Sequence, residues 1–218
     1  MSDFAAARAH MIESQLRPNK LTDERVLAAF GRIRRELFVP EPLRPVAYID
    51  EDLPLGGGRY LMEPMVAARL IQAAAIARSE TVLVVGAATG YEAAVISVLA
   101  RKVVALEEDA ELARRARAAL VDHAIASVQT VEGPLRHGHR PRAPYDAILF
   151  AGAVVATPAE IVEQLAEGGR LLAVERPGGG IGHATLTKRT GGTLIRRVIF
   201  DAATPLLPSF VPPPVFIF

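Results

Sequence analysis

The sequence predicts an α/β fold in which a mainly parallel sheet is covered by helices on both faces. From residue 81 onward, short apolar runs alternate with segments of helical spacing, which is typical of repeated βαβ units. The stretch 82–94, VLVVGAATGYEAA, also reads as a buried strand, a turn of small residues and a helix. In doubly wound sheets such a turn presents backbone N–H groups to a nucleotide-like ligand.

The first 80 residues are expected to add helices and an extended segment to this core. Residues 3–16 have apolar side chains at helical spacing, and Pro18 stops the pattern. Thr22, followed by two acidic residues, predicts the cap of a second helix. Residues 39–58 are rich in proline and glycine and therefore read as turns, and a further helix is predicted over 64–77.

The core elements follow from the alternation itself. Strands are predicted at 81–86, 102–107, 127–131, 145–151 and 169–174, and helices at 90–100, 109–122 and 157–166. Thr157 and Glu160 read as a capping box, with Pro158 at the first helical position, and the glycines at 168–169 are expected to end that helix. Two last strands, 182–188 and 193–200, read as an antiparallel hairpin.

Composition narrows the class of protein. The chain has 218 residues, half of them hydrophobic, which suits one structural domain with a 1–80 extension packed on an 81–218 core. A net charge of +1 gives no overall attraction to nucleic acid or to an anionic membrane. The absence of cysteine excludes disulfides and thiolate sites, and the two histidines of the basic loop 136–142 lack a carboxylate cluster, so no metal is expected. Without a signal peptide or a long apolar run, a cytoplasmic protein is expected.

Several stretches follow one another as the motifs of a known family do. They lie at 11–17, 34–40, 47–50, 53–56, 143–148, 158–165 and 168–171. Together they resemble the protein-L-isoaspartate O-methyltransferases over nearly the whole chain. The resemblance implies a Rossmann-like class I methyltransferase fold with a seven-stranded sheet, S-adenosylmethionine as cofactor, and isoaspartyl proteins or peptides as substrates, in the service of protein repair.

The resemblance also implies where the cofactor binds. The turn after the first core strand supplies Gly86, Ala88, Gly90 and Tyr91. Glu107, at the end of the next core strand, suits a carboxylate that accepts hydrogen bonds from a ribose diol. Glu132 and Gly133 stand where the family has Asp-Gly after the third core strand, so Glu132 is expected either to contact the adenine edge or to lie in a surface turn.

Three positions of this predicted site depart from the family's motifs. Val84 replaces an acidic residue that would lie near the cationic end of the cofactor, and Ala88 adds a Cβ where the family has glycine. Met62 occupies the position of the family's serine, so the catalytic residue stays unassigned. These departures predict weak or lost binding of the cofactor.

Two functions therefore stay open. In the first, the protein transfers a methyl group from S-adenosylmethionine to an isoaspartyl or related carboxylate, as the retained Gly86, Gly90 and Glu107 favour. In the second, it is a non-catalytic binding or scaffold protein on a methyltransferase fold. The apolar end of the chain, 208–218, is expected to pack on its own chain or on a second subunit, which would make a homodimer.

Overall fold

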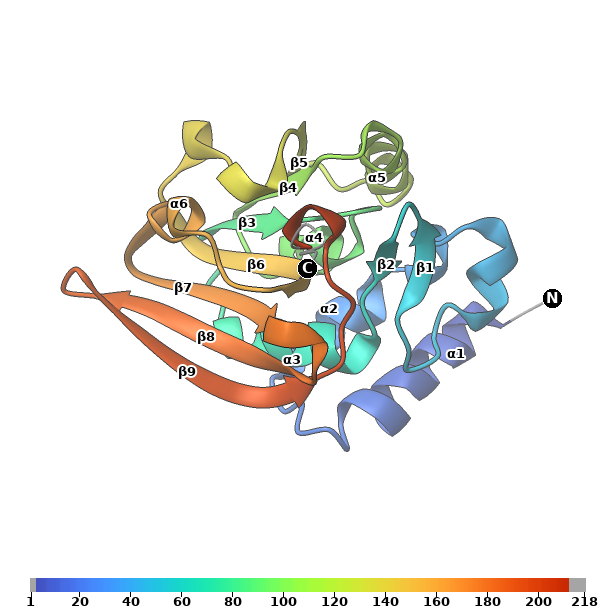
Figure 1. Ribbon diagram of the computed structural model, residues 1–218. Coiled ribbons are helices and arrows are strands. Elements are labelled where there is room, and N and C mark those ends of the chain that lie inside the picture. Colours follow the sequence, from blue (N-terminus) through green and yellow to red (C-terminus); the bar gives the residue numbers. More distant parts are fainter. Residues whose placement is uncertain (1–2, 212–218) are drawn as a thin grey trace, which may run out of the picture.

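The computed structural model describes residues 3–211, and a seven-stranded sheet organises them (Figure 1). The strands are β3 (Thr81–Val85), β4 (Lys102–Glu107), β5 (Val128–Glu132), β6 (Tyr145–Val154), β7 (Leu165–Glu175), β8 (Gly182–Thr190) and β9 (Thr193–Ala202). Their spatial order is β5-β4-β3-β6-β7-β8-β9, with parallel pairing from β5 to β7 and antiparallel pairing from β7 to β9. This order confirms the predicted mainly parallel, Rossmann-like sheet with a late antiparallel hairpin.

The turn of that hairpin lies between the two predicted strands, 182–188 and 193–200, as expected. Thr190 pairs with Thr193, and Gly191 and Gly192 between them both have positive φ, +58° and +74°. Two left-handed residues in a row match the twist of the flanking strands, and glycine adopts this conformation without a steric cost.

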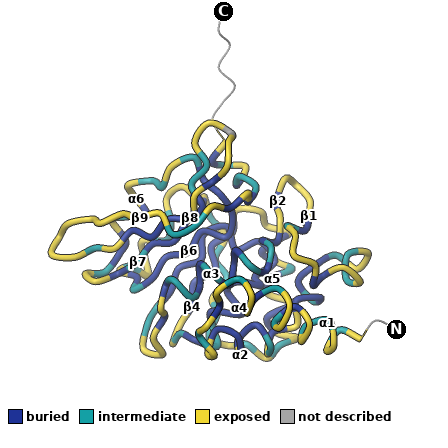
Figure 2. Tube along the Cα trace, turned by 90° about the horizontal axis from the view of Figure 1, so that it is seen from below, coloured by how far each residue is buried: buried dark blue, intermediate teal, exposed yellow. Residues whose placement is uncertain are grey.

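Alternate side chains of β3 divide the core into two layers. Val82 and Val84 belong to a large apolar cluster shared with α2 (Glu24–Arg32), α3 (Pro64–Ala74), α4 (Tyr91–Ser97) and α5 (Ala110–Asp122). Leu83 and Val85 belong to a smaller cluster on the opposite face, covered by α6 (Ala159–Val162) and two 3₁₀ segments, Leu135–His137 and Pro208–Phe210. Both faces of the sheet around β3 are therefore covered, and Figure 2 shows β4 and β6 as mostly buried, whereas β9 is mostly exposed.

The N-terminal part shares the larger cluster. It begins with α1 (Phe4–Met11), which continues as a π-helical stretch, Ile12–Leu16, and it includes 3₁₀ turns at Arg35–Leu37 and Glu41–Val46. Side chains of this part such as Phe30 and Leu70 are fully buried in one cluster with Val84. A separate two-stranded sheet, β1 (Leu53–Gly56) and β2 (Arg59–Leu61), stands beside the carboxyl ends of the main strands (Figure 1).

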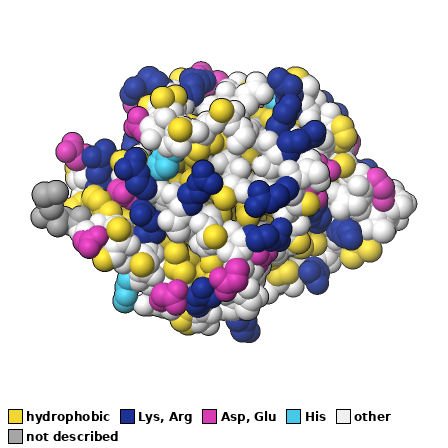
Figure 3. Space-filling model, turned by 180° about the vertical axis from the view of Figure 1, so that it is seen from behind, with side chains coloured by type: hydrophobic (Ala, Val, Ile, Leu, Met, Phe, Trp, Pro, Cys, Tyr) yellow, Lys and Arg dark blue, Asp and Glu magenta, His cyan; other side chains and the backbone are white. Residues whose placement is uncertain are grey.

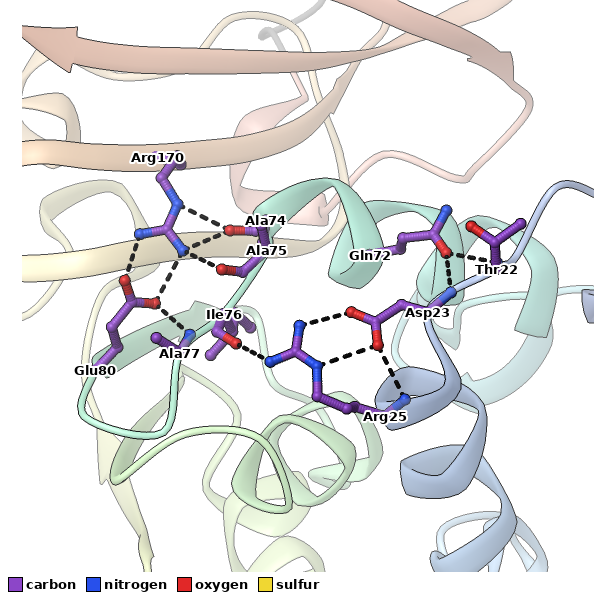
Figure 4. A network of polar contacts seen from close by, with 10 residues as sticks. All are labelled: Thr22, Asp23, Arg25, Gln72, Ala74, Ala75, Ile76, Ala77, Glu80 and Arg170. Atoms are coloured by element: carbon purple, nitrogen blue, oxygen red, sulfur yellow. Dashed lines mark hydrogen bonds and ion pairs between the residues drawn. The ribbon is translucent and has the colours of Figure 1, made fainter.

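Polar contacts hold the N-terminal helices to the sheet (Figure 4). Arg170 of β7 donates to the carbonyl oxygen of Ala74 at the end of α3, at 2.8 Å, and pairs with both oxygens of Glu80. Gln72 of α3 accepts from the backbone N–H of Asp23 at 2.9 Å, before α2. These bonds join three segments that are far apart in the sequence.

Several boundaries differ from the prediction, two of them in the N-terminal part. Asp23, not Thr22, caps α2, because its carboxylate accepts from the N–H of Arg25. The helix predicted to reach residue 77 ends at Ala74, since Ala75 adopts a left-handed conformation. These errors are of one to three residues and leave the architecture unchanged.

The helix predicted over 157–166 is also wrong in length, since α6 spans only four residues. The hydroxyl of Thr157 donates to Glu175 instead of capping the helix. The carbonyl of Gln164 already accepts from the N–H of Tyr145 at 2.8 Å, so the chain has joined the sheet before the glycines at 168–169. Those glycines lie in an irregular part of β7 between two regular pairings with β6.

The surface carries charges of both signs. On the back of the molecule, Figure 3 shows Lys and Arg side chains spread among Asp, Glu and hydrophobic ones. Of the apolar chain end, Phe210 is buried against Phe150 with ring centroids 5.8 Å apart, and 212–218 lie outside the described residues. Within residues 3–211 no helix is long and apolar enough to cross a membrane.

Candidate cofactor site

The turn after β3 lies at the carboxyl edge of the sheet, where open α/β sheets bind ligands. Gly86, Ala88 and Gly90 all have positive φ, +75°, +49° and +91°. The N–H groups of Gly86 and Ala87 donate to the carbonyl of Leu106, at 2.9 and 3.0 Å, which fixes the turn against β4. The predicted small-residue turn is therefore present, although alanine holds one of its left-handed positions.

Glu107 ends β4 directly beside this turn, and its side chain is completely buried. Five N–H groups donate to its carboxylate. Three come from the backbone: Ala88 at 2.6 Å, Glu108 at 2.9 Å and Asp109 at 3.0 Å. The other two come from the guanidinium of Arg59, at 2.5 and 2.9 Å. A carboxylate has about four lone-pair sites, so these donors use its capacity completely.

Arg59 reaches this position from β2, and only 4% of its side chain is exposed. Its Nη2 also donates to the carbonyl of Gly86, at 2.8 Å. One guanidinium therefore bridges the turn after β3 and the carboxylate at the end of β4. Two parallel N–H donors match the geometry of a carboxylate, which makes this a strong, oriented pair.

The turn after β3, Glu107 and β6 border a crevice at the carboxyl edge of the sheet, and Leu207 covers its other side. Its backbone N–H donates to the carbonyl of Ala153 in β6, at 2.8 Å, and its side chain lies over two glycines. A Cβ added to Gly86 would come within 2.9 Å of Leu207 Cδ2, and one added to Gly152 within 2.6 Å of the same atom. The side chain of Leu207 therefore occupies the space that a Cβ would take at both glycines.

A small hollow lies beside Arg59 and Leu207. It is bounded by β2, β6 and the segment 204–207, measures about 10 Å³, and has Met62 and Gly152 among its lining residues. A hollow of this size holds about one water molecule. Because Arg59 takes both oxygens of Glu107 and Leu207 covers Gly86, S-adenosylmethionine, the cofactor implied by the resemblance, does not fit this arrangement.

The three departures from the family motifs lie in or near this closed region. Val84 is buried in the larger apolar cluster, directly before the turn. Ala88 adds a Cβ but still offers its N–H to Glu107. Met62 lines the small hollow, and its carbonyl accepts from Arg35 at 2.8 Å. The structure therefore brings Ala88 and Met62 beside Glu107 and its partner Arg59, whereas the side chain of Val84 lies in the apolar core.

The remaining predicted residues have other neighbours. The carboxylate of Glu132 is half exposed and pairs with Arg117, and Gly133 donates its N–H to the backbone carbonyl of Glu107 at 3.0 Å. Tyr91 is fully buried, with its ring 5.5 Å from that of Phe38, and burial raises the pKa of its hydroxyl. Their assignment to a cofactor stays a prediction.

Two acids with raised pKa values also lie near this edge of the sheet. Glu92, in the first turn of α4, is fully buried, and burial raises its pKa to about 7, partly offset by Arg35. Glu63, half-buried between β2 and α3, has its pKa raised to about 7 by burial and by the charge of Asp52. Both acids carry protons more readily than ordinary glutamates do.

No pattern in the sequence indicates the roles of Arg59 and Leu207. Arginine is usually exposed, and Arg59 and Glu107 are 48 residues apart in the chain. Leu207 lies in a proline-rich segment after the last strand, where no local pattern predicts a contact with Gly86. Both residues reach the site through tertiary contacts alone.

Comparisons with known proteins agree with the fold. The family model described as protein-L-isoaspartate(D-aspartate) O-methyltransferase matches residues 6–198. A relative of that name from Koribacter versatilis is 42% identical over 79% of this chain and 78% of its own length. Another, from Methylorubrum populi, is 41% identical over 84% of this chain and 86% of its own.

Solved structures add to this agreement at the level of the fold. A protein-L-isoaspartate O-methyltransferase structure aligns with a TM-score of 0.80 and 24% identity, covering 92% of this chain and 65% of that one. A Plasmodium falciparum structure, solved as a beta-aspartate methyltransferase in complex with S-adenosyl-L-homocysteine, gives a TM-score of 0.77 and 16% identity over 96% of this chain and all of that one. The chain belongs to the protein-L-isoaspartate O-methyltransferase family of class I, S-adenosylmethionine-dependent methyltransferases.

Proposed function

We propose that the protein is a carboxyl methyltransferase that uses S-adenosylmethionine and acts on isoaspartyl or related carboxylates in proteins. The observation that carries this proposal is the position of Glu107. Its buried carboxylate ends β4 beside the left-handed turn after β3, where a doubly wound sheet holds a ribose diol. The curated relatives, about 40% identical over most of the chain, support the same reaction class.

When bound, the cofactor supplies a methyl group that its sulfonium already activates. The protein therefore needs to position the acceptor more than to move protons. The acceptor would lie near the end of β2, where the predicted acceptor position Met62 is buried beside the hollow. The described arrangement has no room for the cofactor.

A second function has its own supporting observation. The carboxylate of Glu107 is fully occupied by protein donors, and Leu207 covers Gly86. A protein that never opens this crevice would be a non-catalytic binding protein on a methyltransferase fold. One measurement of cofactor binding and one of methyl transfer separate the two functions.

The first measurement is calorimetric titration of the full chain with S-adenosylmethionine and S-adenosylhomocysteine. The second is transfer of a labelled methyl group to an isoaspartyl peptide, with the same peptide containing ordinary aspartate as the control. Methyl transfer to the isoaspartyl peptide but not to the aspartyl control supports the enzyme. If neither cofactor binding nor methyl transfer is found up to the solubility limit of the cofactor, the second function, a non-catalytic binding protein, is supported instead.

Other expectations belong to the same proposal. The partner is an isoaspartyl-containing protein, in keeping with the family. A homodimer through the apolar chain end and a cytoplasmic location stay predictions.

A further inference from the structure

We propose that Arg59 is a built-in latch of the cofactor crevice, and that the cofactor binds only after Arg59 has left Glu107. This inference rests on the proposed function only in naming S-adenosylmethionine and its product as the ligands that the latch excludes. It follows from three features of the chain: the saturation of Glu107, the contact of Leu207 with the turn, and the attachment of Arg59 to a separate small sheet.

The first feature is the competition for Glu107. The guanidinium of Arg59 offers two N–H donors to the two carboxylate oxygens, at 2.5 and 2.9 Å. A ribose diol offers two O–H donors to the same pair of oxygens. Three backbone N–H groups already take the remaining capacity, so the diol and the guanidinium cannot bind together.

The second feature is the contact with the turn itself. Nη2 of Arg59 lies 3.2 Å from the position of a Cβ on Gly86 and donates to the Gly86 carbonyl. Leu207 lies 2.9 Å from that same position. A polar group and an apolar one therefore fill the space that glycine leaves open at a ligand-binding turn, and both must move to admit a ligand.

The third feature makes such a movement feasible. Arg59 lies on β2, which within residues 3–211 pairs only with β1, in a two-stranded sheet apart from the main one. Gly56 at the end of β1 and the turn residues Gly57 and Gly58 are all exposed and all have positive φ. Withdrawal of Arg59 therefore breaks no pairing of the seven-stranded sheet.

The guanidinium is also held by fewer partners than it has donors. Nη1 and Nη2 bond to Glu107 and Gly86, whereas the buried Nε has no hydrogen-bond partner within residues 3–211. The closed position therefore leaves one donor of Arg59 unsatisfied, which lowers the cost of leaving it.

The test is calorimetric titration of S-adenosylhomocysteine into the full chain and two variants. Arg59→Gln removes the charge and the reach of the latch, and we expect its dissociation constant to fall at least tenfold. Leu207→Ala removes the apolar side chain that covers Gly86, and we expect the dissociation constant to fall threefold or more. The matched control is Arg69→Gln, because Arg69 stacks on Phe200, 3.8 Å from the ring centroid, and does not line the hollow. Its dissociation constant should equal that of the unmodified chain.

An unchanged or higher dissociation constant for Arg59→Gln, in protein that melts cooperatively, would overturn the latch. If Arg59→Gln does not fold, Leu207→Ala decides, and an unchanged constant for that variant overturns the proposal in the same way. Methyl transfer separates this outcome from the proposed function. Tighter binding without transfer to an isoaspartyl peptide supports the latch and refutes the enzyme, whereas transfer with equal binding in all variants does the reverse.

Discussion

The guanidinium of Arg59 and the carboxylate of Glu107 form a two-pronged ion pair in which both side chains are buried. Taking two charges out of water is costly, and their attraction offsets this cost only while the pair stays intact. The pair therefore affects both the free energy of unfolding and the access of the cofactor to Glu107. Unfolding measurements report the effect on stability separately.

We expect Arg59→Met to lower the free energy of unfolding by about 3–5 kcal/mol, because it leaves the Glu107 carboxylate buried without its counter-ion. Glu107→Gln in the same chain should recover much of that loss, since no unpaired charge remains. Urea unfolding of the two single variants and the double variant measures the coupling. Equal losses that simply add in the double variant would show that the two residues do not interact.

Gly152 and Leu207 provide a second coupled pair. Gly152→Ala places a Cβ 2.6 Å from Leu207 Cδ2 at a residue with φ of +155°, so we expect a loss of about 1–3 kcal/mol. In a Leu207→Ala background the steric part of this loss should disappear, leaving the backbone strain alone. Thermal unfolding of the four proteins checks this, and an equal cost of Gly152→Ala in both backgrounds would contradict the contact.

Ala88 is expected to gain from replacement by glycine. Its φ of +49° is left-handed, which costs an alanine roughly 1–2 kcal/mol, whereas glycine loses about 0.5–1 kcal/mol through the entropy of the unfolded chain. Ala88→Gly should therefore raise stability slightly or leave it unchanged, and its N–H still bonds to Glu107. The control is Ala73→Gly in α3, which should lose about 1 kcal/mol by denaturant unfolding.

Glu92 makes stability depend on pH. Burial raises its pKa to about 7 in the folded protein, from an ordinary value of 4.5, with Arg35 opposing the shift. Between pH 4.5 and 7 the folded protein therefore holds a proton that the unfolded chain has lost, so the contribution of Glu92 falls as the pH rises.

Glu92→Gln should remove this dependence, which is on the order of 3 kcal/mol across that range. Unfolding of both proteins at pH 5 and pH 7.5 measures the difference, with the exposed Glu111→Gln as control. A stability gap between the unmodified chain and Glu92→Gln that stays constant over this range would refute the assignment.

The sheet could be predicted from sequence because its signal is local. Val82 and Val84 face one layer and Leu83 and Val85 the other, so the strand is apolar throughout, as a parallel strand buried on both faces should be. The hairpin was predictable from two glycines between alternating runs. The length of α6 was not, because the bond from Tyr145 to Gln164 ends the helix through a partner 19 residues away.

The candidate site could be predicted only in part, for the same reason. Glu107 and the turn at Gly86 follow from strand ends, which the sequence marks. Their occupation by Arg59 and Leu207 depends on the packing of the β1–β2 sheet and of the segment after β9 against that edge. No periodicity within either segment encodes such a contact.

The latch also changes what is expected of the three departures from the family motifs. Val84→Glu, Ala88→Gly and Met62→Ser each restore a group that the motifs have, but none of them removes Arg59 from Glu107. In the unmodified background Met62→Ser should therefore leave methyl transfer to an isoaspartyl peptide unchanged.

In an Arg59→Gln background Met62→Ser should raise the turnover number and leave the dissociation constant of S-adenosylhomocysteine unchanged, because a hydroxyl at position 62 would serve the acceptor. Met65→Ser in the same background is the control, as Met65 lies in the first turn of α3 and does not line the hollow. Equal turnover for the Met62 and Met65 variants would show that position 62 does not contribute to the acceptor site.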